Sequence, residues 1–279
     1  MKTTQLLSLG LLPSAGFLLT ACSNDDDASD EFPVRSTWTL TVKATKGGNE
    51  ATTRALSPGG TGNKTLYATW ATTENVYVYY EETNGSYTEH GVLQPNANAA
   101  DATLIGNLTG FDDSFISSAI MGEGGFDIQL QFPKKGDFTW EGQCGTLTDI
   151  AENFDWATAT VRVTGVGDNK TLTVKDEASF NNLQAIVKFT LKDGADNPLN
   201  ASSLIISATG LIDYGKHEGD VTITPKAETN VIWAALRGIN GTVTLTATVD
   251  DDTYTYEKSG VKFENGKYYD ITVKMTQKQ

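Results

Sequence analysis

The chain has 279 residues, enough for one large domain or two ordinary ones, and a formal net charge of −14. That charge argues against nucleic acid or an anionic membrane surface as a partner, although a generic acidic secreted protein would carry it equally well. Glycine is frequent, proline is scarce, and Thr, Val and Tyr recur. This composition favours strands joined by tight turns, so we expect an all-β fold.

The N-terminal segment has the features of a secretory signal peptide. Lys2 is followed by an apolar stretch, residues 6–19, interrupted by proline and glycine. The stretch is too short and too broken to remain in a membrane as a spanning helix. We therefore expect residues 1–21 to be a signal peptide that is removed.

The end of this segment reads Leu-Thr-Ala-Cys at residues 19–22, which resembles the lipobox of bacterial lipoproteins. The resemblance implies that Cys22 becomes the acylated first residue of the mature chain. Residues 22–36 would then form an acidic tether. The run Asp25–Asp27 in this tether is either a solvated linker or an export signal similar to that of surface lipoproteins.

Residues 37–45 alternate between apolar and polar side chains, which predicts a strand with one buried face. The predicted inward side chains are Trp38, Leu40, Val42 and Ala44. Residues 46–55 are mostly small and polar and predict an exposed loop, in which a protease could reach Arg54. A cut at this loop would separate the strand from the rest of the chain.

The rest of the chain reads mainly as short strands separated by turns. Residues 83–110 predict an irregular surface excursion, residues 111–121 and 145–155 predict short helices, and Asn265-Gly266 suits a type I′ hairpin turn. Predicted strands cover 66–70, 76–80, 126–132, 159–163, 171–175, 184–191, 204–208, 220–224, 231–236, 242–249, 253–257, 261–264 and 267–275. This spacing indicates two β-sandwiches, which we place at residues 37–176 and 177–279.

Residues that could carry catalysis or bind a metal are sparse. We expect His90 and His217 to be plain exposed residues and Cys144 to be a buried or idle thiol. The run Asp250–Asp252 predicts a solvated turn, because adjacent acids at a hairpin tip splay apart instead of converging on a cation. No nucleophile, metal or phosphate-binding motif appears, so we expect no enzyme, no cofactor and no metal site. A carboxylate pair for glycoside hydrolysis is neither indicated nor excluded.

The aromatic residues leave one alternative open. Some of them could form a platform on which sugars stack, although aromatic side chains of β-proteins more often pack cores and cross-strand pairs. The candidates are Trp70, Tyr77, Tyr79, Tyr80, Tyr87, Trp140, Trp156, Tyr254, Tyr256, Tyr268 and Tyr269. A surface lipoprotein that binds glycans and does not polymerise is therefore the alternative hypothesis.

Several segments, taken in order with the lipobox, the early strand and Arg54, carry a family resemblance. They are residues 66–78 with Ala68-Thr69-Trp70, residues 145–150 ahead of Asp155-Trp156, residues 180–189, and residues 265–269. Spread over almost the whole mature chain, this arrangement resembles the fimbrillins, the subunits of type V pili.

The resemblance implies two transthyretin-like β-sandwiches exported as a lipoprotein to the outer membrane and the cell surface. An Arg-specific protease would cut the Arg54–Ala55 bond, releasing the lipid anchor and the first strand. A strand from another pilin subunit would then fill the open groove, which is strand addition to a sheet edge. The implied partners are other pilin subunits, the protease, and a host or bacterial surface receptor, and the implied destination is the fimbrium.

One feature departs from the pattern of stalk subunits, which carry extra C-terminal strand residues as a donor. Here only Thr276 to Gln279 follow the last predicted strand. The resemblance therefore favours a tip or accessory subunit that accepts a strand without donating one. In the alternative, residues 267–275 detach and act as the donor.

Overall fold

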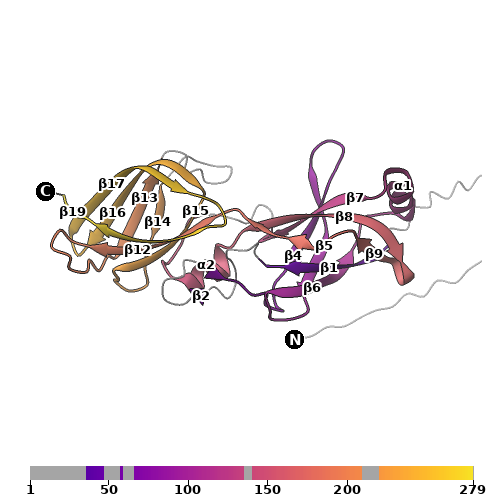
Figure 1. The fold of residues 1–279 in the computed structure, drawn as a ribbon, viewed down its shortest axis with the longest axis horizontal. Helices are drawn as coiled ribbons and strands as arrows, with labels where there is room; N and C mark the ends of the chain where they lie inside the picture. The colour runs from indigo at the N-terminus through magenta and orange to yellow at the C-terminus, as the bar shows by residue number, and fades with distance from the viewer. Residues whose placement is uncertain (1–35, 47–56, 59–65, 135–139, 209–219, 279) are drawn as a thin grey trace, which may run out of the picture. The chain divides into compact units, whose positions relative to one another are not determined.

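A computed structural model of the chain describes residues 36–46, 57–58, 66–134, 140–208 and 220–278. These residues form mainly β-strands, with two α-helices and one short 3-10 turn, so the predicted all-β class is confirmed (Figure 1). The strands are organised around two hydrophobic clusters, one in each half of the described chain. A separate two-residue pair joins β2 (Ser57–Pro58) and β3 (Leu66–Tyr67).

The larger sheet contains the first strand. Its members are β1 (Trp38–Thr45), β4 (Val76–Glu81), β5 (Tyr87–Pro95), β6 (Asp101–Leu108), β7 (Phe126–Phe132), β8 (Ala157–Gly167), β9 (Thr171–Val174), β10 (Ala178–Ser179) and β11 (Asn181–Asn182). The order is β10-β1-β6-β5-β4-β7-β8-β11, and β9 pairs with both β1 and β8. Through β9 the sheet returns to β1, so it closes on itself like a barrel around the first cluster.

The second half of the chain forms two sheets that share the second cluster. One has the order β15-β12-β18, and the other has the order β14-β13-β16-β17-β19. Their bounds are β12 (Ala185–Lys192), β13 (Ser203–Ala208), β14 (Val221–Ile223), β15 (Val231–Leu236), β16 (Ile239–Val249), β17 (Asp252–Phe263), β18 (Tyr268–Lys274) and β19 (Thr276–Gln277). Two sheets packed over a common apolar core make a β-sandwich.

Both predicted helices are confirmed, and their ends have local causes. Helix α1 (Asp113–Glu123) begins after Asp112, whose carboxylate accepts a hydrogen bond from Phe115 N at 2.6 Å, and it ends at Gly124 in the left-handed conformation. Helix α2 (Leu147–Asn153) begins after Thr146, whose hydroxyl accepts from Asp149 N at 3.1 Å.

The segment that carries α2 lies between β7 and β8 of the larger sheet, yet it packs on the second cluster. Trp140, Ile150 and Trp156 belong to that cluster, whereas Ala178 and Phe180 belong to the first. Each half of the chain thus supplies residues to the core of the other half. The division into 37–176 and 177–279 stays a prediction.

The prediction of an irregular excursion over residues 83–110 is wrong. Strands β5 and β6 occupy most of it and pair with each other, and Leu93, Leu104 and Leu108 are completely buried. Gly91 and Gly106 are part of the pairing, because a Cβ on Gly106 would meet Val92 O at 2.1 Å. Local composition suggested a loop, but the close approach of two strands requires these small residues.

The prediction of a hairpin at Asn265-Gly266 is also wrong. The turn forms, since Lys267 N donates to Glu264 O at 3.1 Å and Gly266 has φ 75°. The strands on its two sides enter different sheets, however: β17 pairs with β16 and β19, whereas β18 runs parallel to β12. A turn dipeptide fixes the local reversal and leaves open which sheet the next strand joins.

Candidate functional site

The candidate site is the slot that β1 occupies in the larger sheet. On one edge, all eight residues of β1 pair antiparallel with β6, from Trp38↔Leu108 to Thr45↔Asp101. On the other edge, β1 pairs in parallel with β9 at Thr39 and Leu40 and with β10 at Ala44 and Thr45. The first strand of the fold is therefore hydrogen-bonded on both sides, and it is a member of the closed ring between β6 and β9 (Figure 1).

The four side chains that alternation placed on one face of β1 are buried. Trp38 is 5% exposed, Leu40 and Val42 are 0% exposed, and Ala44 is 3% exposed. Between them, Thr41 and Lys43 are exposed. The strand thus supplies a continuous row of apolar side chains to the first cluster, and its removal stays a prediction.

The middle of β1 is less completely covered on the edge opposite β6. Pairing with β9 ends at Leu40↔Leu172 and pairing with β10 begins at Ala44↔Ala178. A surface groove of about 460 Å³ lies there, lined by Thr41, Lys43 and residues 171–177. This edge of β1 is therefore reachable from solvent over a few residues.

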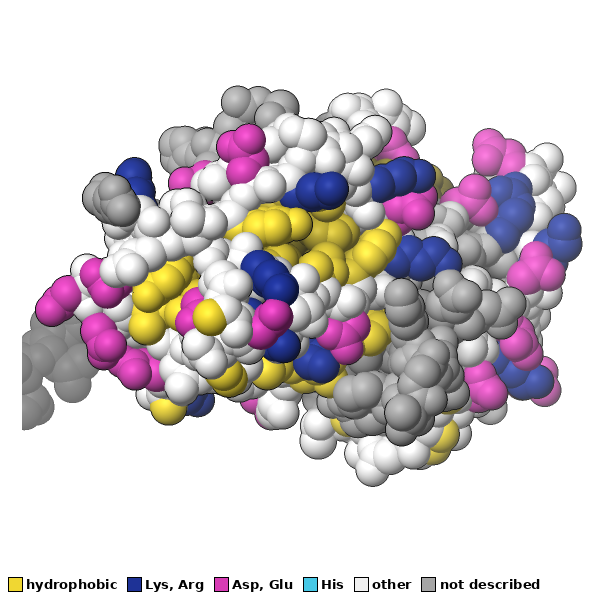
Figure 2. Space-filling view, turned by 60° about the vertical axis from the view of Figure 1, so that its left-hand side comes forward, with side chains coloured by type: hydrophobic (Ala, Val, Ile, Leu, Met, Phe, Trp, Pro, Cys, Tyr) yellow, Lys and Arg dark blue, Asp and Glu magenta, His cyan; other side chains and the backbone are white. Residues whose placement is uncertain are grey.

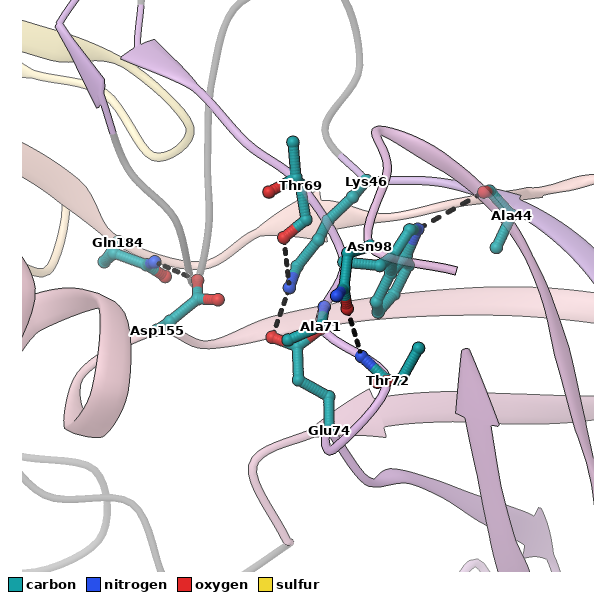
Figure 3. A network of polar contacts seen from close by, with 10 residues as sticks. Ala44, Lys46, Thr69, Ala71, Thr72, Glu74, Asn98, Asp155 and Gln184 are labelled. Atoms are coloured by element: carbon teal, nitrogen blue, oxygen red, sulfur yellow. Dashed lines mark hydrogen bonds and ion pairs between the residues drawn. The ribbon is translucent and has the colours of Figure 1, made fainter. Parts of the chain in front are cut away.

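The C-terminal end of β1 is fixed by a buried charge (Figure 3). Lys46 is 3% exposed, and its ammonium forms an ion pair with the buried carboxylate of Glu74. Lys46 Nζ also donates to Thr69 O at 3.3 Å and lies 4.5 Å from the ring centroid of Trp70. Trp70 Nε1 in turn donates to Ala44 O at 3.3 Å. The end of β1 and the residue that follows it, Lys46, are thus anchored against the first cluster.

The N-terminal end of β1 is held by a more exposed charge. Lys170 Nζ donates to Ser36 Oγ at 2.6 Å and to the Asp113 carboxylate at 2.8 Å, and it lies 5.4 Å from the ring centroid of Trp38. The hydrogen bond from Lys170, followed by the one from Ser36, lowers the pKa of Asp113 below its ordinary value. This contact connects the start of β1 to helix α1.

Sequence reasoning missed Lys46, Glu74 and Lys170. A signal for Lys46 was present, because residue 46 continues the two-residue period of Trp38, Leu40, Val42 and Ala44. The prediction of an exposed loop over residues 46–55 is wrong for Lys46, which is buried. Nothing local marked Glu74 or Lys170, since both are brought to β1 by distant parts of the chain.

Other predicted residues are placed as follows. Cys22, Arg54, Ala55 and His217 lie outside the described residues, so lipidation and processing stay predictions. His90 is not exposed: it is 6% exposed in β5, its ring stacks on Phe111 at 3.9 Å, and its Nδ1 lies 2.7 Å from Thr109 O.

Little else in the described part of the chain suggests chemistry. Cys144 is half-buried beside Thr146, and Asp250–Asp252 form an exposed turn. No group of three or more potential metal ligands occurs among the described residues. The described α-helices, of 11 and 7 residues, are both too short to cross a membrane.

Among the aromatic side chains that could stack on sugars, Trp70, Tyr79, Trp140 and Trp156 are buried, Tyr87 is exposed and the others are half-buried. Trp233 and Tyr268 are half-buried and stack with their ring centroids 5.6 Å apart. Burial, followed by the carboxylate of Asp270, raises the pKa of Tyr268 to about 12. Figure 2 shows hydrophobic side chains reaching the surface beside lysines and acidic residues, so apolar surface is available to a ligand.

The chain is similar to known proteins in its structure. No family model matches the chain, and no curated protein matches it. Among solved structures, a fimbrial protein from Bacteroides ovatus is 14% identical with a TM-score of 0.41, and the match covers 86% of this chain and 49% of that one. A fimbrial assembly protein from Parabacteroides distasonis is 13% identical with a TM-score of 0.40, and the match covers 86% and 91% of the two chains. The chain thus spans about half the length of the first of these proteins.

Proposed function

We propose that the chain is a structural and adhesive subunit of a type V pilus and not an enzyme. It is exported as a lipoprotein through acylated Cys22 and is cut after Arg54 at the cell surface. The cut frees β1, and a strand from another subunit takes its place in the slot. The final location is the fimbrium, where other subunits and a surface receptor are the partners.

One observation carries this proposal: β1 precedes every other described element and is paired on both edges within the closed larger sheet. A single cut between residues 47 and 55 separates β1 covalently from everything it pairs with. Because β1 is at the N-terminal end of the fold, it can leave its slot without any other segment having to unthread. Its departure exposes the paired edges of β6 and β9, which are templates for another strand.

The energetics favour refilling the slot. Burying Trp38, Leu40 and Val42 contributes about 1.5–3 kcal/mol for each side chain, or about 5–9 kcal/mol in total before entropy is counted. A strand with apolar residues at the same alternate positions recovers this term together with the backbone hydrogen bonds of β6. Assembly by strand exchange is therefore driven by the same burial that holds β1.

The C-terminal strands support a tip or accessory role. Strand β18 pairs along its length with β12, and β19 pairs with β17. Val273 and Met275 are buried in the second cluster. Donating these strands to another subunit would open this cluster, so the chain suits the acceptor role better than the donor role.

A glycan-binding surface lipoprotein is the second candidate, favoured by the half-buried Trp233–Tyr268 stack. If this stack binds sugars, Trp233→Ala abolishes retention on a glycan array while Tyr87→Ala, at an exposed aromatic elsewhere, leaves it unchanged. Equal binding by both variants argues against this candidate.

Limited proteolysis tests the main proposal. The unlipidated mature chain is treated with an Arg-specific protease, and the new N-terminus is read by mass spectrometry. We expect a single early cut that gives Ala55 and a folded core of residues 55–279. The variant Arg54→Lys keeps the charge and should resist this cut. A permanent first strand would be indicated if cleavage after Arg54 unfolds the larger sheet.

A further inference from the structure

The ion pair between Lys46 and Glu74 has a consequence for which strands can enter the slot. We propose that Glu74 is a specificity-determining residue: it selects an incoming strand that carries a lysine at the position of Lys46. This inference rests on the proposed strand exchange and adds to it a rule about the partner strand.

The pair lies at the inward face of the sheet and is shielded from water. The side chains of Lys46 and Glu74 are 0% and 4% exposed. The ammonium is surrounded by the carboxylate, by Thr69 O at 3.3 Å and by the rings of Trp70 and Phe132, whose centroids lie 4.5 and 5.3 Å away. These groups form a compact pocket for a lysine ammonium at the end of the apolar row of β1.

The two partners belong to different pieces of the molecule after a cut at Arg54. Lys46 leaves with β1, whereas Glu74, Thr69 and Trp70 remain with the core. Glu74 is held in place by its own turn, because Ala71 N donates to Glu74 Oε2 at 2.9 Å and Glu74 N donates to Ala71 O at 2.9 Å (Figure 3). The carboxylate therefore stays at the end of the slot when the ammonium departs.

An incoming strand then covers the Glu74 carboxylate with the residue that it places at the position of Lys46. A strand with lysine at this position restores the ion pair, whereas a strand with an apolar residue there leaves the carboxylate without this cation, which is costly in a buried setting. The pair also fixes register. A slip of one residue turns the cation to the outer face, and a slip of two moves it away from Glu74.

Lys43 provides an internal contrast on the same strand. Its ammonium lies 3.9 Å from Glu177, and the two side chains are 74% and 65% exposed. A solvent-exposed pair of this kind contributes little to binding. Removing the charge of Lys43 should therefore not affect strand selection.

A competition experiment measures the selection directly. The full mature chain carries an inserted site for an unrelated sequence-specific protease within residues 47–56 and is cut there. Equal amounts of two peptides of residues 36–46, one with the natural sequence and one with Lys46→Met, are then offered to the cut chain. Mass spectrometry of the purified complexes gives the ratio of peptides taken up. Parallel competitions use a Lys43→Met peptide as the matched control and a Glu74→Gln chain as the acceptor.

We expect the natural peptide to be preferred over Lys46→Met by about tenfold or more on the unchanged chain. The preference should disappear or reverse on Glu74→Gln, because the buried ammonium of Lys46 then loses this carboxylate. Lys43→Met should compete equally with the natural peptide on both chains. Uptake of both peptides without discrimination overturns the inference and leaves strand exchange intact. If neither peptide displaces the resident strand, strand exchange itself fails, and the inference fails with it.

Discussion

The first and last long strands of the described chain are held in opposite ways. Strand β1 is paired on both edges, with β6 on one side and with β9 and β10 on the other, and it belongs to the closed ring of the larger sheet. Strand β18 pairs with β12 alone among the described strands and lies at the edge of its sheet. Removing β1 opens a closed sheet and leaves two unpaired edges, whereas removing β18 leaves one.

This difference teaches where a replaceable strand can be built. A slot between two strand edges, lined by apolar side chains, determines the direction, the register and the inward side chains of the strand that fills it. A single open edge determines them less completely. The ends of β1 are also fixed by Lys46 and Lys170, which contact groups far away in sequence. The end of β18 is tied by Lys274 to Asp196 at 2.5 Å, on the surface.

The largest difference is expected between a chain shortened at its N-terminal end and a chain shortened at its C-terminal end. A chain that begins at Ala55 lacks β1 and loses about 5–9 kcal/mol of gross burial, so we expect fast hydrogen exchange in β6 and β9 and a strong tendency to associate. A chain that ends at Met275 lacks only β19, whose residues are exposed, and should exchange like the full chain. Similar protection of β6 in both truncated chains would contradict the role given to β1.

Single substitutions of Leu40 in β1 and of Met275, directly after β18, should affect different hydrophobic clusters. Leu40→Ala and Met275→Ala each remove a buried side chain, and each should lower the free energy of unfolding by about 2–5 kcal/mol. In the cut chain, Leu40→Ala should also speed release of the strand, whereas Met275→Ala should not, because its side chain lies in the other cluster. Thr41→Ala, at an exposed position of β1, is the control and should change neither quantity.

The contact at the start of β1 should give the smallest effect, and one that depends on pH. The pKa of Asp113 is lowered in the fold, so its contribution is complete above the ordinary value of 3.8 and is lost as pH falls through the lowered value. Asp113→Asn should therefore release the strand from the cut chain slightly faster than the natural chain at pH 7 and at pH about 5.

The difference should shrink as pH falls further below 3.8, because the natural carboxyl group then loses its charge and comes to resemble the neutral amide of the variant. Asp127→Asn removes another exposed carboxylate, paired with Arg162 at 3.1 Å, and serves as the control that should leave release unchanged. A difference between Asp113→Asn and the natural chain that grows towards acid would show that the pKa of Asp113 is shifted the other way.

Much of the local structure follows from the sequence. Alternation predicted the buried face of β1, and α1 and α2 overlap the short helices predicted over residues 111–121 and 145–155. The pairing of β9 with β1, the entry of β18 into the sheet of β12, and the contact of Lys46 with Glu74 join segments distant in sequence. Periodicity and turn chemistry are local properties and do not specify such partners.

The strands β5 and β6 were missed for a related reason. Gly91 and Gly106 look like loop residues, yet each faces a backbone carbonyl of the opposite strand, where a Cβ would lie at 2.2 or 2.1 Å. Only the pairing itself reveals why these positions are glycine.

The most direct test of the central claim is an isotope exchange of the first strand. The full mature chain is cut after Arg54 and incubated with an excess of a heavy-isotope-labelled peptide of residues 36–54, and native mass spectrometry follows the mass of the complex. We predict that the labelled peptide replaces the resident strand while hydrogen exchange shows that β4 to β8 remain folded. A resident strand that stays in place on a folded core, or a core that unfolds once the chain is cut, would contradict the account.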